Sequence, residues 1–75
     1  MKRTTEIYAH NEHVNENGVK IVDTVYCETD TLSSGAVYKT RYSWVHEIGD
    51  HKMLWYETTQ LARMKKEMEK GGFYN

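Results

Sequence analysis

Residues 36–48, AVYKTRYSWVHEI, constrain the fold of this chain more than any other stretch. Aromatic and β-branched side chains dominate the run, and such residues fit a pleated, half-buried surface. The run therefore predicts a long β-strand. Gly49, which follows it, suits the first central position of a type II′ turn, so we expect the strand to fold back on residues 51–57 as a hairpin.

The register of this hairpin follows from the turn. It predicts the cross-strand pairs Glu47–Lys52, Val45–Leu54 and Trp44–Trp55. Opposite charges and two indoles falling opposite each other support a real hairpin. The alternative is a helix beginning at Asp50, because Leu54, Leu61 and Met68 keep helical spacing. The aromatic residues at 55–56 and the threonines at 58–59 favour instead a strand that ends near Glu57.

An earlier hairpin is predicted at Asn17-Gly18, because both residues tolerate the positive φ of a type I′ turn. A two-residue turn there predicts the pairs Val14–Ile21, His10–Val25 and Tyr8–Cys27, with all six residues on one face. A four-residue loop over 15–18 is the alternative, and it would shift the register and change the faces. The polar segment 30–35, DTLSSG, is expected to connect this hairpin to the next strand.

The period of the pattern changes from Thr59 onward. Leu61, Met64 and Met68 form one stripe of a helix over about 59–70, with Thr58 or Thr59 as the cap. Gly71-Gly72 is expected to end the helix, and Phe73 and Tyr74 to fold back onto the core. The expected fold class is α+β, in one small domain over residues 1–75. It is a four-stranded antiparallel β-meander of two hairpins, with strands at about 5–14, 19–29, 36–48 and 51–57, followed by one C-terminal α-helix packed on the sheet.

The two faces of the second hairpin differ in chemistry. One face carries Tyr38, Thr40, Tyr42, Trp44, His46, Ile48, Met53 and Trp55. The favoured interpretation is that this aromatic face is the core beneath the helix, because a small domain buries its largest apolar surface. Lys39, Arg41, Lys52 and Tyr56 would then form an exposed, mildly basic face. In the alternative, the helix covers Val37, Val45 and Leu54, and the aromatic face is an open platform.

Composition narrows the functional classes. The formal net charge is −1, so no overall field draws the chain to nucleic acid or to an anionic membrane. Cys27 is the only cysteine, which excludes an intrachain disulfide and a Cys-rich zinc module. Neither a signal-like segment nor an apolar run of membrane-spanning length is present, so we expect a cytoplasmic protein that does not enter a membrane.

The segment HEIGDH, residues 46–51, invites comparison with the zinc-protease motif. Histidines four apart share one face of a helix, whereas His46 and His51 are five apart around a glycine. On the hairpin they become diagonal neighbours, but structural zinc needs four ligands and the chain offers one thiol. His10 and His13 point to opposite faces of a strand. We therefore expect no metal site and no cofactor.

A catalytic role receives little support from the residues. The predicted register places His10 diagonal to Cys27, but no oxyanion donor loop and no residue that would activate the thiol can be identified. The chain also lacks a phosphate-binding loop and a serine nucleophile elbow. We therefore expect a protein that is not an enzyme and has no catalytic residues.

About half of the chain, from residue 35 to residue 72, resembles the N-terminal arm-binding domains of phage tyrosine recombinases. The residues that carry the resemblance are Tyr42, Gly49, Lys52, Tyr56, Thr58 and Ala62. The resemblance implies a three-stranded sheet that binds DNA, followed by a helix. The chain departs from that pattern in its net charge, its lack of a basic cluster and its additional N-terminal hairpin, and we do not assign it to the family.

The function expected from these features is that of a small non-catalytic binding module for another protein. Its size and its proline-free single domain are typical of inhibitory accessory proteins of phage or mobile-element type. The expected partner-binding residues are Tyr38, Lys39, Arg41, Tyr42, Trp44, Trp55 and Tyr56. The alternative is a nucleic-acid-binding domain that uses Lys39, Arg41, Tyr42 and Lys52. The two free edges of a meander would also allow pairing into a homodimer.

Overall fold

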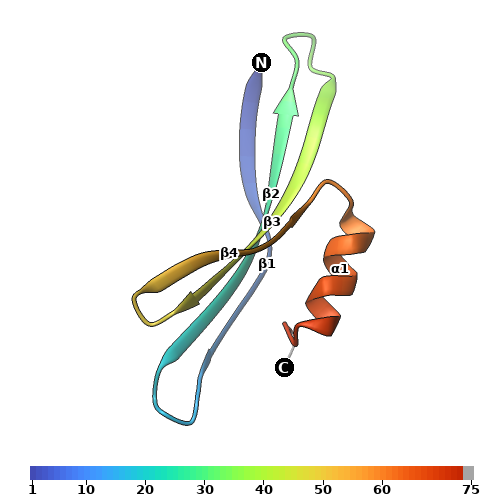
Figure 1. The fold of residues 1–75 in the computed structure, drawn as a ribbon. Helices are drawn as coiled ribbons and strands as arrows, with labels where there is room; N and C mark the ends of the chain where they lie inside the picture. The colour runs from blue at the N-terminus through green and yellow to red at the C-terminus, as the bar shows by residue number, and fades with distance from the viewer. Residues whose placement is uncertain (74–75) are drawn as a thin grey trace.

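The computed structural model describes residues 1–73 and contains an antiparallel sheet followed by one helix (Figure 1). Its elements are β1 (Lys2–Val14), β2 (Lys20–Thr31), β3 (Val37–Ile48), β4 (His51–Thr58) and α1 (Leu61–Lys70). The strands lie in the order β1-β2-β3-β4, so each strand pairs with its neighbours in sequence. This arrangement confirms the predicted α+β meander with a C-terminal helix.

The first two connections of the sheet use the same five-residue turn. In the β1–β2 connection, the N–H of Asn15 donates to the carbonyl of Val19, and the N–H of Gly18 donates to the carbonyl of Asn15. In the β2–β3 connection, Leu32 and Ala36 repeat the first of these bonds, and Gly35 repeats the second. Gly18 and Gly35 have φ values of 79° and 91°. In each connection the first four residues form a type I turn, and the glycine at its fourth position adopts the left-handed conformation. The hydrogen bond between the first and fifth residues leaves three residues in the loop.

The predicted type I′ turn at Asn17-Gly18 is wrong, because no residue other than glycine adopts a positive φ in residues 1–73. Val14 pairs with Lys20 rather than with Ile21. A shift of one residue exchanges the faces of a strand, so His10 lies opposite Thr24 rather than Val25. The third predicted pair, Tyr8–Cys27, is also absent. Ala9 lies opposite Val25, a bulge leaves Tyr8 unpaired, and Glu6 lies opposite Cys27.

The second hairpin follows the prediction near its turn and departs from it farther along. Gly49 has φ 58°, and the pairs Glu47–Lys52 and Val45–Leu54 are present as predicted. The register then shifts, so Trp44 lies opposite Tyr56 rather than Trp55. The shift is a bulge at Trp55, which inserts one extra residue into β4. Tyr56 therefore lies on the same face as Trp44 and not on the predicted basic face.

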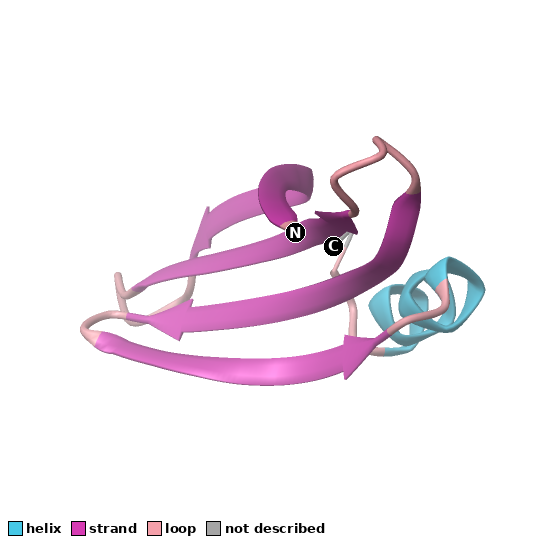
Figure 2. Cartoon of the chain, turned by 90° about the horizontal axis from the view of Figure 1, so that it is seen from above, coloured by secondary structure: helices cyan, strands magenta, loops and turns pink. Residues whose placement is uncertain are grey.

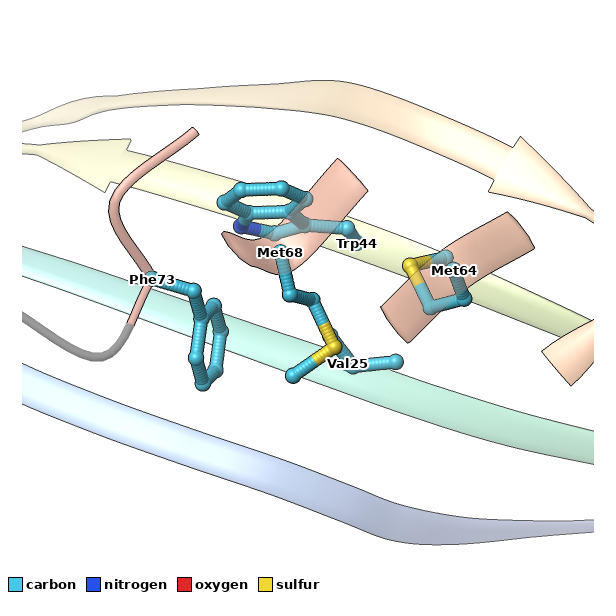
Figure 3. Close-up of a cluster of buried hydrophobic side chains, with 5 residues drawn as sticks. All are labelled: Val25, Trp44, Met64, Met68 and Phe73. Atoms are coloured by element: carbon cyan, nitrogen blue, oxygen red, sulfur yellow. The ribbon is translucent and has the colours of Figure 1, made fainter. Parts of the chain in front are cut away.

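The core forms where α1 crosses one face of the sheet, which we call the covered face (Figure 3). Val25 of β2 and Trp44 of β3 are buried there, Trp44 with only 2% of its surface exposed. Met64 and Met68 of the helix pack on them from above, together with Phe73. The structure thus confirms that the aromatic face is the core. The alternative, with the helix over Val37, Val45 and Leu54, is wrong.

The N-terminal end of α1 differs from the prediction. The helix begins at Leu61, about two residues later than expected, because β4 continues to Thr58 and Gln60 occupies the N-cap position. The Thr58 hydroxyl accepts a hydrogen bond from the N–H of Gln60 at 3.1 Å, so it orders the connection without capping the helix.

The C-terminal end of α1 forms a Schellman motif, as the glycine pair predicts. The N–H of Phe73 donates to the carbonyl of Met68 at 2.9 Å, the N–H of Gly72 donates to that of Glu69 at 3.4 Å, and Gly72 has φ 74°. This motif returns the chain toward the sheet and buries Phe73 as predicted. Tyr74, predicted to do the same, lies outside the described residues.

The helix covers only part of the sheet. A helix of ten residues is about 15 Å long, whereas the molecule measures 50 × 24 × 14 Å. Figure 1 shows the β1–β2 hairpin and the β2–β3 connection projecting beyond opposite ends of the helix, and Figure 2 shows the same sheet from above. The face of the sheet away from α1, which we call the open face, has no element packed on it within residues 1–73.

Candidate functional site

The exposed aromatic residue with the most defined surroundings is Trp55, at the bulge of β4. About half of its surface, 51%, is accessible. Its ring nevertheless has two aromatic neighbours, since the ring centroid lies 4.7 Å from that of His46 and 6.1 Å from that of Trp44. Trp55 is therefore exposed on one side and supported on the other.

A buried carboxylate orients both of these supporting rings. The Nε1–H of Trp44 donates to Oδ1 of Asp23 at 2.9 Å, and the Nδ1–H of His46 donates to the same oxygen. Asp23 lies on β2, next to β3, and is buried. Because a buried carboxylate is stable only when it is hydrogen-bonded, these two donors compensate for its burial. Asp23 thus determines the positions of the rings against which Trp55 rests.

Two further apolar side chains lie near Trp55, at the turn end of the second hairpin. Met53 lies opposite His46 and Ile48 lies opposite His51, so both share the covered face with Trp55. Both remain exposed, at 44% and 37%. We call Ile48, Met53 and Trp55 the Trp55 patch. It is an apolar surface on the covered face, on the part of the sheet that leads to the β3–β4 turn.

The other predicted partner-binding residues do not join this patch. Trp44 is buried, and Tyr42 and Tyr56 are half-buried against the core. Tyr38 is exposed, but it lies six residues from Trp44 along β3, or about 20 Å away at strand spacing. Lys39 and Arg41 alternate with Tyr42 and belong to the open face. The seven residues therefore do not form one surface, and Trp55 alone belongs to the patch.

Tyr42 also has surroundings that differ from those of a partner-binding residue. Its ring makes an edge-on contact with Tyr8, with centroids 5.9 Å apart. Burial raises the pKa of the Tyr42 phenol, and the neighbouring Cys27 adds to this effect. The phenol therefore stays protonated at neutral pH, and its ring contacts Tyr8 of β1 across the intervening strand β2.

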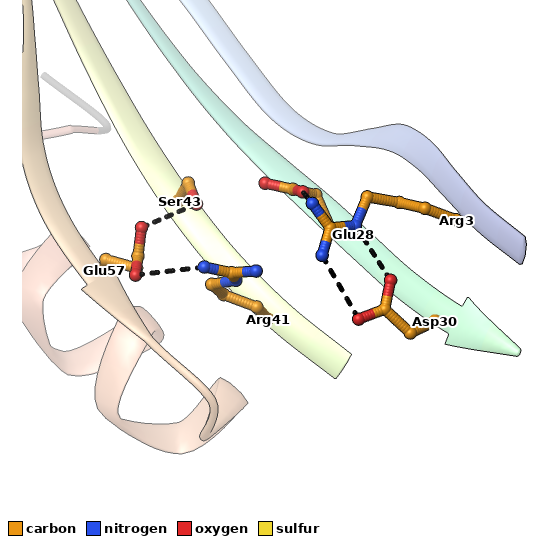
Figure 4. Close-up of polar contacts among 6 residues, drawn as sticks. All are labelled: Arg3, Glu28, Asp30, Arg41, Ser43 and Glu57. Atoms are coloured by element: carbon orange, nitrogen blue, oxygen red, sulfur yellow. Dashed lines mark hydrogen bonds and ion pairs between the residues drawn. The ribbon is translucent and has the colours of Figure 1, made fainter. Parts of the chain in front are cut away.

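The open face carries ion pairs rather than a basic surface (Figure 4). Asp30 accepts from Nε of Arg3 at 2.8 Å, and Glu57 lies 3.5 Å from Arg41. At the other end of the face, the pairs Lys20–Glu12 and Lys52–Glu47 measure 2.8 and 3.4 Å. The sequence-based prediction of a mildly basic face is wrong, because strand pairing places carboxylates beside these cations.

Neither of the proximities weighed for catalysis or metal binding becomes a site. His10 lies on the open face, where its Nδ1 is 3.0 Å from the Thr24 hydroxyl, whereas Cys27 lies on the covered face. His46 and His51 are diagonal neighbours as predicted. However, residues 1–73 contain no group of three or more His, Cys, Asp or Glu side chains placed to hold a metal ion. That part of the chain also forms no pocket.

Sequence reasoning missed Asp23, the residue on which the site depends. Its signal was a single acidic residue inside the β-branched run IVDTV, residues 21–25. A carboxylate at such a position is either exposed at an edge or paired with donors from a neighbouring strand. Which donors these are follows only from the β2–β3 register, which places Asp23 opposite His46.

Comparison of the chain with protein-family models, with curated proteins and with solved structures finds no match. Within the described residues, the single helix is too short and too polar to cross a membrane.

Proposed function

We propose that this chain is a small non-catalytic module that binds another protein through the Trp55 patch. One observation carries the proposal. Trp55 is half exposed, yet its ring rests on Trp44 and His46, which Asp23 orients. Tryptophan is enriched among the residues that contribute most to binding energy at protein interfaces.

The support beneath Trp55 matters for affinity. Binding a partner costs free energy when a side chain must be immobilised, at about 0.5–1.5 kcal/mol for each flexible side chain. A ring already held against His46 loses less freedom on binding. Met53 beside it is flexible and polarisable, and so adapts to the shape of a partner. Together they provide a rigid anchor with an adaptable neighbour.

The charges favour a protein target over nucleic acid. The alternative function depends on Lys39, Arg41, Tyr42 and Lys52, but Tyr42 lies on the covered face and the three cations on the open face. Arg41 and Lys52 are each within 3.5 Å of a carboxylate. Neutralising phosphates would require these cations to exchange partners. The inhibitory role and the phage or mobile-element type remain predictions from composition.

The test is a capture experiment with matched variants. The immobilised wild-type chain, Trp55→Ala and Leu54→Ala are incubated with lysate of the organism that encodes the chain, and retained proteins are quantified by mass spectrometry. Leu54 is the control because it is the adjacent exposed apolar residue on the opposite face. We expect a partner that the wild type and Leu54→Ala retain and that Trp55→Ala loses.

The captured protein is then purified and titrated against the same variants by calorimetry. Trp55→Ala should weaken binding by about 30-fold, the effect of losing a residue worth about 2 kcal/mol. The affinity should change little between 50 and 200 mM salt, since few phosphate-type contacts are involved. Equal capture by the wild type and Trp55→Ala would contradict the proposal, as would retention of nucleic acid with a steep dependence on salt.

A further inference from the structure

The dimensions of the chain are those of an incompletely covered sheet. Its radius of gyration is 14.3 Å, whereas a compact chain of 75 residues has one of about 11 Å. Its accessible surface is 5420 Å², whereas about 4,800 Å² is typical for a monomer of 8.9 kDa. The chain therefore exposes more surface than a domain of its size normally does. The open face contributes to this excess.

Apolar side chains gather in the middle of the open face. Ile7 lies opposite Tyr26, and Val45 lies opposite Leu54. Val22 lies opposite Glu47, which makes it a diagonal neighbour of Val45. Ile7 and Leu54 are 63% and 59% exposed. We call these five residues, Ile7, Val22, Tyr26, Val45 and Leu54, the open-face patch. It extends across all four strands.

We propose that a second copy of this chain packs its open face against the open face of the first, forming a two-fold symmetric sandwich. The available area meets the requirement for such an interface. The four strands hold 13, 12, 12 and 8 residues, and at about 3.3 Å per residue and about 4.8 Å between strands they present about 710 Å² in projection. A standard stable interface buries about 600–1,000 Å² on each partner. Each copy then supplies the second layer that the other lacks.

The charges on the open face fit a second copy better than a partner of strong net charge. Arg3, Asp30, Arg41 and Glu57 lie toward one end of the open face, and Glu12, Lys20, Glu47 and Lys52 lie toward the other. Both ends therefore carry both signs. Whichever ends a two-fold axis brings together, carboxylates of one copy can face cations of the other without net repulsion. Polar groups also lie within the patch, since Val22 lies between Glu12 and Glu47, and Thr24 lies between His10 and Val45. The proposed interface therefore combines apolar contacts with polar ones, as protein interfaces generally do.

The test measures molecular mass by sedimentation equilibrium between about 1 and 500 μM for the wild type, Leu54→Lys and Met53→Lys. The two variants place the same charge at adjacent positions of β4, on the open and the covered face respectively. We expect a wild-type mass approaching twice 8.9 kDa. Leu54→Lys should weaken association by about 100-fold, because the symmetric interface loses the same contact twice. Met53→Lys should leave the mass unchanged, and far-UV circular dichroism confirms that both variants are folded.

Three outcomes would overturn the proposal. A wild-type chain that is monomeric throughout the concentration range has no such interface. A dimer that Met53→Lys weakens as much as Leu54→Lys is not held by the open face. A dimer that both variants leave intact uses another surface, such as the free edge of β1. The inference is independent of the proposed partner binding, because Met53→Lys and Trp55→Ala test the covered face alone.

Discussion

Gly71 is the residue whose substitution gives the sharpest test of how α1 packs on the sheet. A Cβ built at this position would lie 2.7 Å from Cη2 and 3.3 Å from Cζ3 of the Trp44 indole, and 3.1 Å from the carbonyl oxygen of Glu67. The φ of Gly71 is −85°, which any residue can adopt. The glycine is therefore required for space rather than for backbone conformation.

The expected cost of Gly71→Ala follows from two opposing terms. Overpacking a filled core costs about 1–3 kcal/mol, because Trp44 must leave its position between the helix and Asp23. Replacing glycine restricts the unfolded chain and returns about 0.4–1 kcal/mol. The net loss should be about 1–2 kcal/mol, out of a total of about 4–11 kcal/mol for 75 residues. Each kcal/mol lowers Tm by about 4–8 °C in a domain of this size.

The assay is urea denaturation followed by far-UV circular dichroism, in the wild type and in a Trp44→Phe background. The phenyl ring lacks the indole atoms that a new Cβ would meet, so Gly71→Ala should cost less than about 0.5 kcal/mol in that background. Gly72→Ala is the matched control. It forces alanine to φ 74° and should cost about 1–2 kcal/mol in both backgrounds. A Gly71→Ala chain as stable as the wild type, or equally destabilised in both backgrounds, would refute the steric argument.

The remaining predictions concern an ion pair and a turn. The hydrogen bond from Arg3 lowers the pKa of Asp30 in the folded chain below its ordinary value of about 3.8. The ion pair therefore stabilises the fold fully above pH 3.8, and this stabilisation is lost as the pH falls through the pKa of Asp30 in the folded state. Arg3→Met should therefore lower the free energy of unfolding near neutral pH, and the difference from the wild type should shrink in acid. Denaturation curves that give the same difference at every pH would contradict this. Asn15→Ala removes the oxygen that accepts from Asn17 and Val19 and should cost about 1 kcal/mol. Asn15→Asp keeps an acceptor there, so an equal loss in both variants would exclude the side-chain bonds as the cause.

The sequence predicted the elements well, because their signals are local. The aromatic and β-branched run before Gly49 formed β3, and the turn at Gly49 set the first pairs of the second hairpin. The glycine pair after Lys70 ended the helix, as its left-handed preference requires. The pattern of large apolar residues also identified the buried face correctly.

The candidate site was less accessible from the sequence, because two bulges and a turn register decide it. The bulge at Trp55 moved Tyr56 to the covered face. The first turn contains hydrogen bonds to the Asn15 side chain, and the Asn17-Gly18 pair alone does not predict them. The register that this turn sets places His10 and Cys27 on opposite faces of the sheet. Each of these shifts is one residue long, and one residue is enough to exchange the two faces of a strand.

The amino-acid sequence by itself determined that this chain forms a four-stranded meander with one helix, since strand, turn and cap preferences act over a few neighbouring residues. Only the tertiary structure decided which side chains meet across strands. It placed Asp23 beneath Trp44 and His46, left Trp55 half exposed beside them, and paired the cations of the open face with carboxylates. Burial and charge pairing depend on the register between distant segments, and that register is set by the bulges and turns of the folded sheet.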